Sequence, residues 1–221
     1  MYKAIVFDFD GTIVDTEQHL FNIINKHLIS HNATPITLDF YRENIGGEAK
    51  DLHEYLEQTI GNDNKETIYK EHHQTSNQLE INPTIKQLMK YLKQRHIPMA
   101  IATSSYKKDI FPVFKSLGLD EYINIIVGRE SVEYVKPEPE LYLTAVQQLN
   151  YSPTHCLAIE DSVNGATAAF RAGLDVIVNT NYMTQTQDFS TIPYIGKDLN
   201  NEEIINRFFE KGHVWMKCRG N

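Results

Sequence analysis

Five short stretches of the chain are apolar on both faces, and segments with helical periodicity separate them. Strands buried on both faces read as continuous apolar runs, and helices between such runs are typical of a parallel sheet covered by helices. The pattern therefore predicts an α/β fold with a Rossmann-like parallel sheet core. The five expected strands are AIVFDF (4–9), PMAIAT (98–103), INIIVG (123–128), CLAIED (156–161) and DVIVN (175–179).

The helices between these strands are marked by their periodicity and by their ends. In the segment 84–96, apolar residues recur so that they form one face of a helix. The segment 161–173 begins with Asp161 and Ser162, residue types that cap helix N-termini, and it ends at Gly173. We expect one helix in each segment, packed on the sheet.

One connection is much longer than a strand-helix-strand unit requires. Asp10 and Thr103, which end the first two strands, are 93 positions apart, whereas a direct crossover takes roughly 30 residues. The helix just before the second strand already supplies that crossover. We therefore expect residues 16–82 to form an inserted α-helical cap on a core made of residues 1–15 and 83–221.

The inserted segment shows helical patterns and no strand pattern. Helices are expected in HLFNIINKHLI (19–29), in KDLHEYLEQTI (50–60) and around 64–79, with breaks at Gly46-Gly47 and Gly61-Asn62. The chain would enter and leave the cap through two hinges, near Asp15–Glu17 and near Gln78–Pro83.

Composition and charge narrow the function classes. With 221 residues, of which 41% are hydrophobic and 23% charged, the chain can bury a full core. Its net charge of −8 argues against non-specific nucleic-acid binding, which needs a basic face. No apolar run approaches the ~20 residues of a membrane span. Asp8 and Asp10 also interrupt the only stretch that could form the core of a signal peptide.

The cysteine content agrees with a reducing compartment. The two cysteines, Cys156 and Cys218, make no disulfide framework, and Cys156 lies in an apolar stretch. We therefore expect a cytoplasmic protein that has neither nucleic acid nor a membrane as its partner. A monomer is expected, with a homodimer left open.

Polar side chains follow the expected strands where their carboxyl ends meet. In open α/β sheets, ligands collect at this edge. Carboxylates suit a hard cation such as Mg²⁺, while a hydroxyl and an ammonium group suit phosphoryl oxygens, so the set predicts a site for both. The residues are Asp8, Asp10, Thr103, Lys136, Glu160 and Asp161.

Four separated segments, in this order and spacing, resemble the motifs of the haloacid dehalogenase-like hydrolase superfamily. They are DFDGT (8–12), ATS (102–104), VKPEPELY (135–142) and IEDSVNGATAAFRAG (159–173). A cap between the first and second motifs resembles the subgroup that contains phosphoglycolate phosphatases and β-phosphoglucomutase-like enzymes. The family's dehalogenases lack an acid two residues after the nucleophile, so Asp10 favours phosphoryl transfer over carbon–halogen cleavage.

The resemblance implies a role for each reacting group. Asp8 would attack phosphorus in line and form an aspartyl-phosphate. Asp10 would protonate the leaving alkoxide and then deprotonate the hydrolytic water. Residues two apart on an extended strand share a face, so both carboxyls can act on one substrate. Thr103 would bond a transferring phosphoryl oxygen, and Lys136 would neutralise the charge of the nucleophile and the phosphate.

The resemblance also implies a Mg²⁺ site. The Asp8 carboxylate, the Asp10 backbone carbonyl and Asp161 would be ligands. Glu160 would either ligate the ion directly or hold a metal-bound water, and both alternatives remain open. Because Mg²⁺ prefers six oxygen ligands, waters would complete the coordination.

Further candidates for binding the phosphate or the substrate lie in turns. Gly11 and Thr12 would let the chain turn toward the cap and place backbone N–H groups near phosphate. Ser104 is a candidate, although Ser104 and Ser105 also suit the N-terminal cap of the next helix. Gly46-Gly47 is either a simple turn or a cap loop where substrate is recognised.

Three functions are compatible with these residues. We favour a Mg²⁺-dependent phosphatase that hydrolyses a small phosphorylated metabolite, a phosphate monoester, through the aspartyl-phosphate. A β-phosphoglucomutase-like hexose-phosphate mutase is the first alternative, and a catalytically silent phosphate-binding module is the second. The mutase pattern places a histidine and an arginine where this chain has Leu20 and Ala49, with His19 and Lys50 one position away. This departure favours hydrolysis.

Two features receive ordinary structural interpretations. His72-His73 lies in a polar helical segment of the cap, and solvated surface is favoured over a metal site. The tail that contains Trp215, the single tryptophan, is expected to pack on the core.

Overall fold

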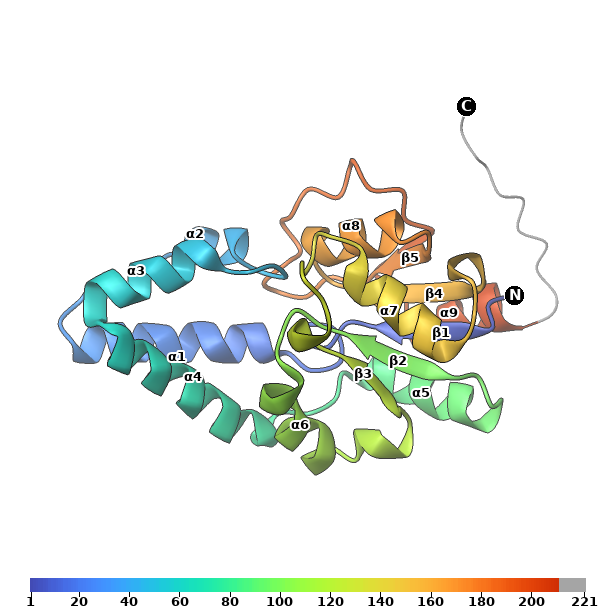
Figure 1. Ribbon diagram of the computed structural model, residues 1–221, viewed down its shortest axis with the longest axis horizontal. Helices are drawn as coiled ribbons and strands as arrows, with labels where there is room; N and C mark the ends of the chain where they lie inside the picture. Colours follow the sequence, from blue (N-terminus) through green and yellow to red (C-terminus); the bar gives the residue numbers. More distant parts are fainter. Residues whose placement is uncertain (211–221) are drawn as a thin grey trace.

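The computed structural model describes residues 1–210 and consists of a sheet-containing body with a group of helices at one end (Figure 1). The predicted packing of Trp215, and the end of the expected core segment, lie outside the described residues. Within the described part of the chain, no helix is long and apolar enough to cross a membrane.

The centre of the molecule is a six-stranded sheet in the order β3-β2-β1-β4-β5-β6. Every pair of neighbouring strands is parallel, which confirms the predicted α/β fold. β1 lies in the interior of the sheet, with Ile5 opposite Met99 on one side and Leu157 on the other. The strands are β1 (Ala4–Phe7), β2 (Met99–Ala102), β3 (Ile125–Val127), β4 (Cys156–Glu160), β5 (Asp175–Val178) and β6 (Gly196–Lys197).

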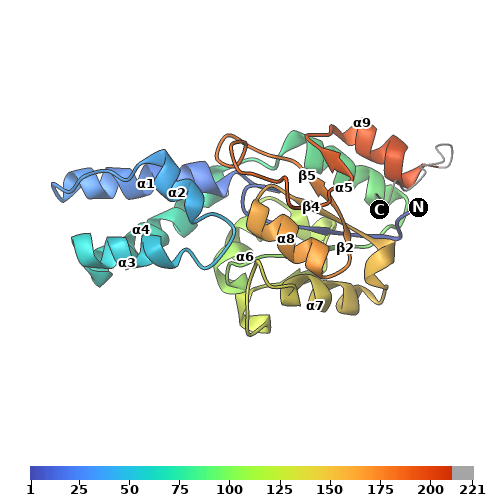
Figure 2. The ribbon, with the colours of Figure 1, turned by 90° about the horizontal axis from the view of Figure 1, so that it is seen from above.

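Helices cover both faces of the sheet (Figure 2). On β1, Ile5 and Phe7 pack in one buried cluster with α5, α6 and α9, while Ala4 and Val6 pack in a second cluster with α7 and α8. Alternate strand residues point to opposite faces of the sheet, so a strand that is apolar throughout packs against the helices on both faces. These helices are α5 (Pro83–Gln94), α6 (Lys107–Ser116), α7 (Glu140–Leu149), α8 (Val163–Arg171) and α9 (Asn201–Ile204).

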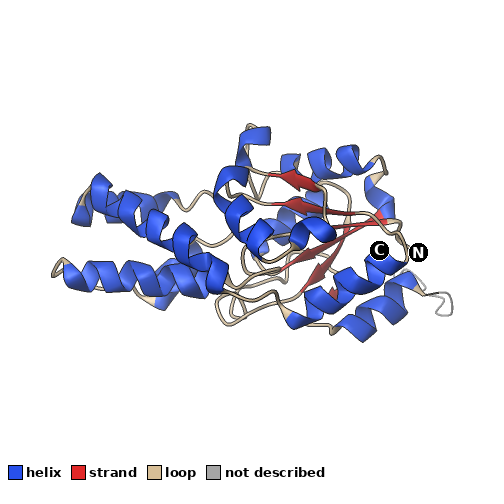
Figure 3. Cartoon of the chain, turned by 90° about the horizontal axis from the view of Figure 1, so that it is seen from below, coloured by secondary structure: helices blue, strands red, loops and turns tan. Residues whose placement is uncertain are grey.

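The segment between β1 and α5 folds into four α-helices and a short 3-10 helix (Ser76–Gln78), and the α-helices extend from one end of the sheet (Figure 3). These helices share a buried apolar cluster of their own, to which Met183 contributes from the loop after β5. Arg42 on α2 donates to the Met183 carbonyl oxygen at 2.9 Å, so this loop and the helical segment are joined. The helices are α1 (Thr16–Ser30), α2 (Leu38–Glu43), α3 (Lys50–Ile60) and α4 (Asn62–Thr75).

Two backbone connections join the helical segment to the sheet, and they lie side by side. Val14 forms an isolated antiparallel bridge with Ile81, and the amide of Asn82 donates to the Ile13 carbonyl oxygen at 2.8 Å. Both connections therefore leave the sheet next to the end of β1, where the predicted site residues begin.

Candidate active site

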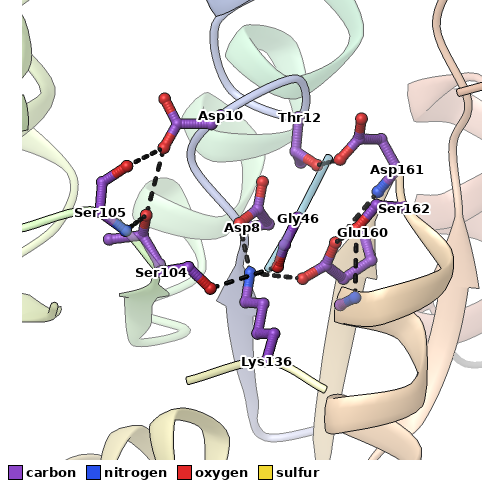
Figure 4. A network of polar contacts seen from close by, with 12 residues as sticks. Asp8, Asp10, Thr12, Gly46, Ser104, Ser105, Lys136, Glu160, Asp161 and Ser162 are labelled. Carbon is purple, nitrogen blue, oxygen red and sulfur yellow. Dashed lines mark hydrogen bonds and ion pairs between the residues drawn. The ribbon is translucent and has the colours of Figure 1, made fainter. Parts of the chain in front are cut away.

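The predicted catalytic and metal-binding residues meet at the carboxyl edge of the sheet (Figure 4). Asp8 directly follows β1, Thr103 follows β2, and Glu160 is the last residue of β4. Lys136 reaches the same place from the segment between β3 and α7. All four of these side chains are buried. Parallel strands bring their ends together, which is why residues far apart in sequence converge here.

Lys136 lies between two buried carboxylates. Its ammonium group donates to Asp8 Oδ1 and, at 2.6 Å, to Glu160 Oε1. Burial alone would lower the pKa of Lys136, but the charges of Asp8 and Glu160 raise it above its ordinary value. The hydroxyl of Tyr142, on the first turn of α7, donates to the same Glu160 oxygen at 2.5 Å. Glu160 therefore fixes the position of the lysine that faces Asp8.

The nucleophile candidate retains one free oxygen. Asp8 Oδ2 is buried and has no hydrogen-bond partner among the described residues. Burial raises the pKa of Asp8 well above its ordinary range, although the nearby Lys136 opposes this shift. A buried acceptor without a partner costs free energy, so a ligand that supplies a donor or a positive charge would be stabilised at this atom.

Three carboxylates are placed where they could bind a cation. Oxygens of Asp8, Glu160 and Asp161 lie within 4.8 Å of one another, and all three residues are buried. Burial also raises the pKa of Asp161 well above its ordinary range, as do the charges of Asp8 and Glu160. Asn181 holds Asp161 by donating to Oδ2 at 2.7 Å. Hard oxygen ligands in this number fit a divalent cation such as Mg²⁺.

Asp10 lies on the other side of Asp8 from Asp161 (Figure 4). Its carboxylate accepts hydrogen bonds from three hydroxyls: Thr16 at 2.7 Å, Thr103 at 3.2 Å and Ser105 at 2.7 Å. The expectation that Ser105 caps the next helix is therefore wrong, because α6 begins after Tyr106 with no side-chain cap. These three hydroxyls hold the Asp10 carboxyl next to that of Asp8. A carboxyl held in this way can transfer a proton to a leaving group.

The turn after the first motif differs from expectation in part. The Gly11 amide donates to the Val14 carbonyl oxygen at 2.7 Å, so the predicted contact of this N–H with phosphate is not available in this structure. A close approach explains the glycine, because its φ is +87° and an added Cβ would overlap the Asp161 carboxylate. Thr12 is buried, and its hydroxyl donates to Asp161 at 3.3 Å.

The Gly46-Gly47 loop from the helical segment closes over the site. Ser104 Oγ donates to the Gly46 carbonyl oxygen at 3.2 Å, a contact that also corrects its expected role as a helix cap. Gly46 has a φ of +82°, and a Cβ there would overlap Ser162 Oγ. The loop therefore approaches the sheet edge too closely for a side chain. Both glycines line the cavity described next, and their contact with substrate stays a prediction.

A cavity of about 960 Å³ lies between the sheet edge and the helical segment. Asp8, Asp10 and Lys136 line it on the sheet side, and residues of α1, α3 and α4 line the other wall. His72 belongs to that wall and is only 7% exposed, so its predicted place on solvated surface is wrong. Burial lowers the pKa of His72 to about 4. The polar residues around His72 in α4 predict exposure to solvent, but in the structure His72 faces the cavity.

We predict that Gly165→Ala lowers both stability and activity by displacing Glu160. A Cβ at Gly165, on α8, would overlap the carboxylate of Glu160. Alanine raises helix propensity by about 1 kcal/mol, but forcing Glu160 from its position costs about 1–3 kcal/mol and moves Lys136. We expect lower stability in urea unfolding together with reduced activity. Thr167→Ala on the same helix is the matched control, and wild-type behaviour of Gly165→Ala would contradict the prediction.

Comparison with known proteins agrees with this geometry. Residues 5–179 match the family described as haloacid dehalogenase-like hydrolase. The chain is 35% identical over 195 residues to YhcW of Bacillus subtilis, covering 86% of this chain and 88% of that protein. It is 30% identical over 181 residues to the phosphorylated carbohydrates phosphatase of Thermotoga maritima, covering 79% of this chain and 83% of that protein.

The fold agrees as well. The crystal structure of CbbY from Rhodobacter sphaeroides in complex with phosphate superposes with a TM-score of 0.79. The match covers 92% of this chain and 96% of that one, at 24% sequence identity. At this identity the likeness bears on the fold, including the helical segment that follows β1.

Proposed function

The chain belongs to the haloacid dehalogenase-like hydrolase family, and on that premise we propose that it is a Mg²⁺-dependent phosphatase of small phosphate monoesters. The observation that carries the proposal is the environment of Asp8. This carboxylate is buried against the Lys136 ammonium group, keeps one oxygen free, and faces the cavity with Asp10 beside it. Such a carboxylate has the positioning that a nucleophile toward phosphorus needs.

The proposed reaction has two displacements at phosphorus. In the first, an oxygen of Asp8 forms a bond to phosphorus while the ester P–O bond breaks, and Asp10 gives its proton to the leaving alkoxide. In the second, Asp10 takes a proton from water as the water oxygen attacks the phosphoaspartate, which releases phosphate and restores Asp8. Lys136 and the hydroxyl of Thr103 would bond the phosphoryl oxygens, where negative charge is concentrated.

We include Mg²⁺ in the proposal, held by the carboxylates of Asp8 and Asp161 and by the Asp10 backbone carbonyl. When bound, the ion would neutralise charge on the phosphoryl oxygens. Both oxygens of Glu160 already accept hydrogen bonds: Oε1 from Lys136 and Tyr142, and Oε2 from the Asp161 amide at 3.3 Å. This arrangement supports contact with the ion through a water rather than directly.

The residues that line the cavity favour hydrolysis over the mutase reaction. Leu20 lines the cavity at the position where the mutase pattern has histidine. The neighbouring His19 instead shares a hydrogen bond with Thr75 Oγ1 at 2.7 Å within the helical segment. Ala49 lines the cavity at the position where the mutase pattern has arginine. The absence of both side chains from these positions favours water as the acceptor.

We further propose that residues 16–82 act as a cap that closes over a small substrate, with 1–15 and 83–221 as the catalytic core. The hinges would lie near Asp15–Glu17 and near Gln78–Pro83, next to the point where Val14 and Ile81 pair through their backbones. A cavity enclosed on both sides supports small molecules as substrates and excludes folded phosphoproteins. Efficient dephosphorylation of a folded phosphoprotein would overturn this part.

The proposal is tested by phosphate release from a panel of small phosphate esters, with Mg²⁺ and with EDTA. We expect release that needs Mg²⁺ and falls by at least about a hundredfold in EDTA. Equal release in EDTA would contradict the metal requirement. Isomerisation of a hexose phosphate with a bisphosphate primer, in place of release, would instead indicate the mutase.

A further inference from the structure

The wall of the cavity that faces the reaction centre is acidic. Glu17 on α1 lines the cavity one residue after Thr16, whose hydroxyl donates to Asp10 at 2.7 Å. Tyr41 holds the Glu17 carboxylate by donating to Oε2 at 2.6 Å. Burial and the charge of Asp10 raise the pKa of Glu17 to about 7. Above this pH Glu17 adds a second negative charge next to Asp10, and this part of the cavity then disfavours an anionic leaving group.

The less exposed cations that line the cavity are already paired with carboxylates. Lys65, with a side chain only 13% exposed, lies 3.0 Å from Glu57. Arg129 lies 3.1 Å from Glu48. Lys136 is held by Asp8 and Glu160. The other lysines of the lining are all exposed: Lys50, Lys70 and Lys108.

Two histidines of this wall are poor sources of positive charge. Burial lowers the pKa of both His53 and His72, which disfavours their charged forms. They are hydrogen-bonding groups rather than anion-binding groups. A leaving group with its own carboxylate or phosphate would approach Glu17 and Asp10, while the less exposed cations of the lining, Lys65, Arg129 and Lys136, are already held by carboxylates.

A second and independent observation concerns Tyr69 on α4. Its hydroxyl is buried and has no hydrogen-bond partner among the described residues, yet Tyr69 lines the cavity. His53 packs edge-on against the ring, with centroids 5.3 Å apart, and so holds it in place. A buried hydroxyl without a partner is costly, and a hydroxyl on a bound substrate would satisfy it.

We propose that the cap wall selects phosphate monoesters whose leaving group is short, uncharged and hydroxyl-bearing, with Glu17 rejecting a second anion and Tyr69 bonding a substrate hydroxyl. This inference rests on the proposed phosphatase function and names its substrate class. It predicts discrimination between esters of nearly the same size that differ by one negative charge.

Two matched substrate pairs test the charge rule. They are 2-hydroxyethyl phosphate against 2-phosphoglycolate, and glycerol 3-phosphate against 3-phosphoglycerate. At pH 8, where Glu17 is mostly ionised, we expect kcat/KM to favour the neutral member of each pair by about tenfold or more, as one like-charge contact implies. In Glu17→Gln the ratio should fall several-fold, because the isosteric amide still accepts from Tyr41. Glu43→Gln, an exposed residue of α2 outside the cavity, should keep the wild-type ratio.

Tyr69→Phe tests the hydroxyl contact. The variant loses no hydrogen bond within the described structure, so its thermal stability should match wild type. We expect KM for glycerol 3-phosphate to rise about threefold to tenfold, while KM for propyl phosphate, which has no hydroxyl on its leaving group, stays unchanged.

The outcomes separate this inference from the proposed function. Carboxylate-bearing esters turned over as well as their neutral partners, or equal effects of Tyr69→Phe on both substrates, would overturn the inference and leave the phosphatase intact. Absence of Asp8-dependent phosphate release from every ester would overturn the proposed function itself.

Discussion

Asp8→Asn is expected to abolish phosphate release, with a loss of at least about a thousandfold. An amide nitrogen or oxygen at this position cannot form the acyl phosphate, whatever else binds the substrate. The fold should survive, because Lys136 keeps its contact with Glu160 at 2.6 Å and a buried negative charge is removed. Since burial raises the pKa of Asp8, the native state disfavours its charge, and stability should match or exceed that of wild type.

The measurement for Asp8→Asn is phosphate release with Mg²⁺ beside thermal unfolding of the same preparation. Asp51→Asn, an exposed residue at the start of α3, is the matched control and should keep full activity. A folded Asp8→Asn variant that retains more than a few per cent of activity would exclude Asp8 as the nucleophile.

Lys136→Met should lose both activity and stability. Lys136 is 2% exposed and is the cation between Asp8 and Glu160, so its removal leaves two buried carboxylates without a counter-charge. Breaking a buried pair by removing one partner costs about 3–5 kcal/mol of unfolding free energy. Activity should fall with it, since no ammonium group would then neutralise the nucleophile and bond the phosphoryl oxygens.

The pH dependence of the Lys136→Met defect follows from the sign of the Asp8 shift. The pKa of Asp8 is raised in the folded state, and loss of Lys136 raises it further. The destabilisation should therefore be smallest at and below the ordinary Asp pKa of about 3.9, where Asp8 binds its proton in both states, and should grow as the pH rises. Urea unfolding at pH 5 and pH 8 in EDTA measures this difference.

Two further variants complete that test. Lys93→Met, which removes a half-exposed lysine 3.5 Å from Glu121, should change stability little at either pH. The double variant Lys136→Met with Asp8→Asn should recover part of the lost stability and none of the activity, because the two sites share one interaction. An equal defect at both pH values would show that Lys136 acts through packing alone.

Much of the fold could be predicted because its signals are local. The strands β1, β2, β4 and β5 are continuous apolar runs, and α3 covers residues 50–60 as predicted because Gly61 ends it with a φ of +83°. The convergence of Asp8, Thr103, Lys136 and Glu160 follows from the rule for parallel strand ends.

The parts that were missed depend on contacts between distant segments. β6 has two residues and pairs only with β5, so it carries no periodicity of its own. Thr16, the first residue of the insertion, and Ser105, which lies beyond its end, both donate to Asp10. His72 is buried by the walls of the cavity, and the polar residues around it gave no sign of this. The cap cluster is completed by Met183, more than a hundred positions from most of its members.

The central claim is that Asp8 carries the phosphoryl group between substrate and water. The most direct test is mass analysis of the peptide that contains Asp8, after acid quench during turnover of a good ester. We expect a mass increase of one phosphoryl group on that peptide, removed by hydroxylamine and absent in Asp8→Asn. Hydrolysis at full rate with no label on this peptide at any quench time, or a label on another residue, would contradict the account.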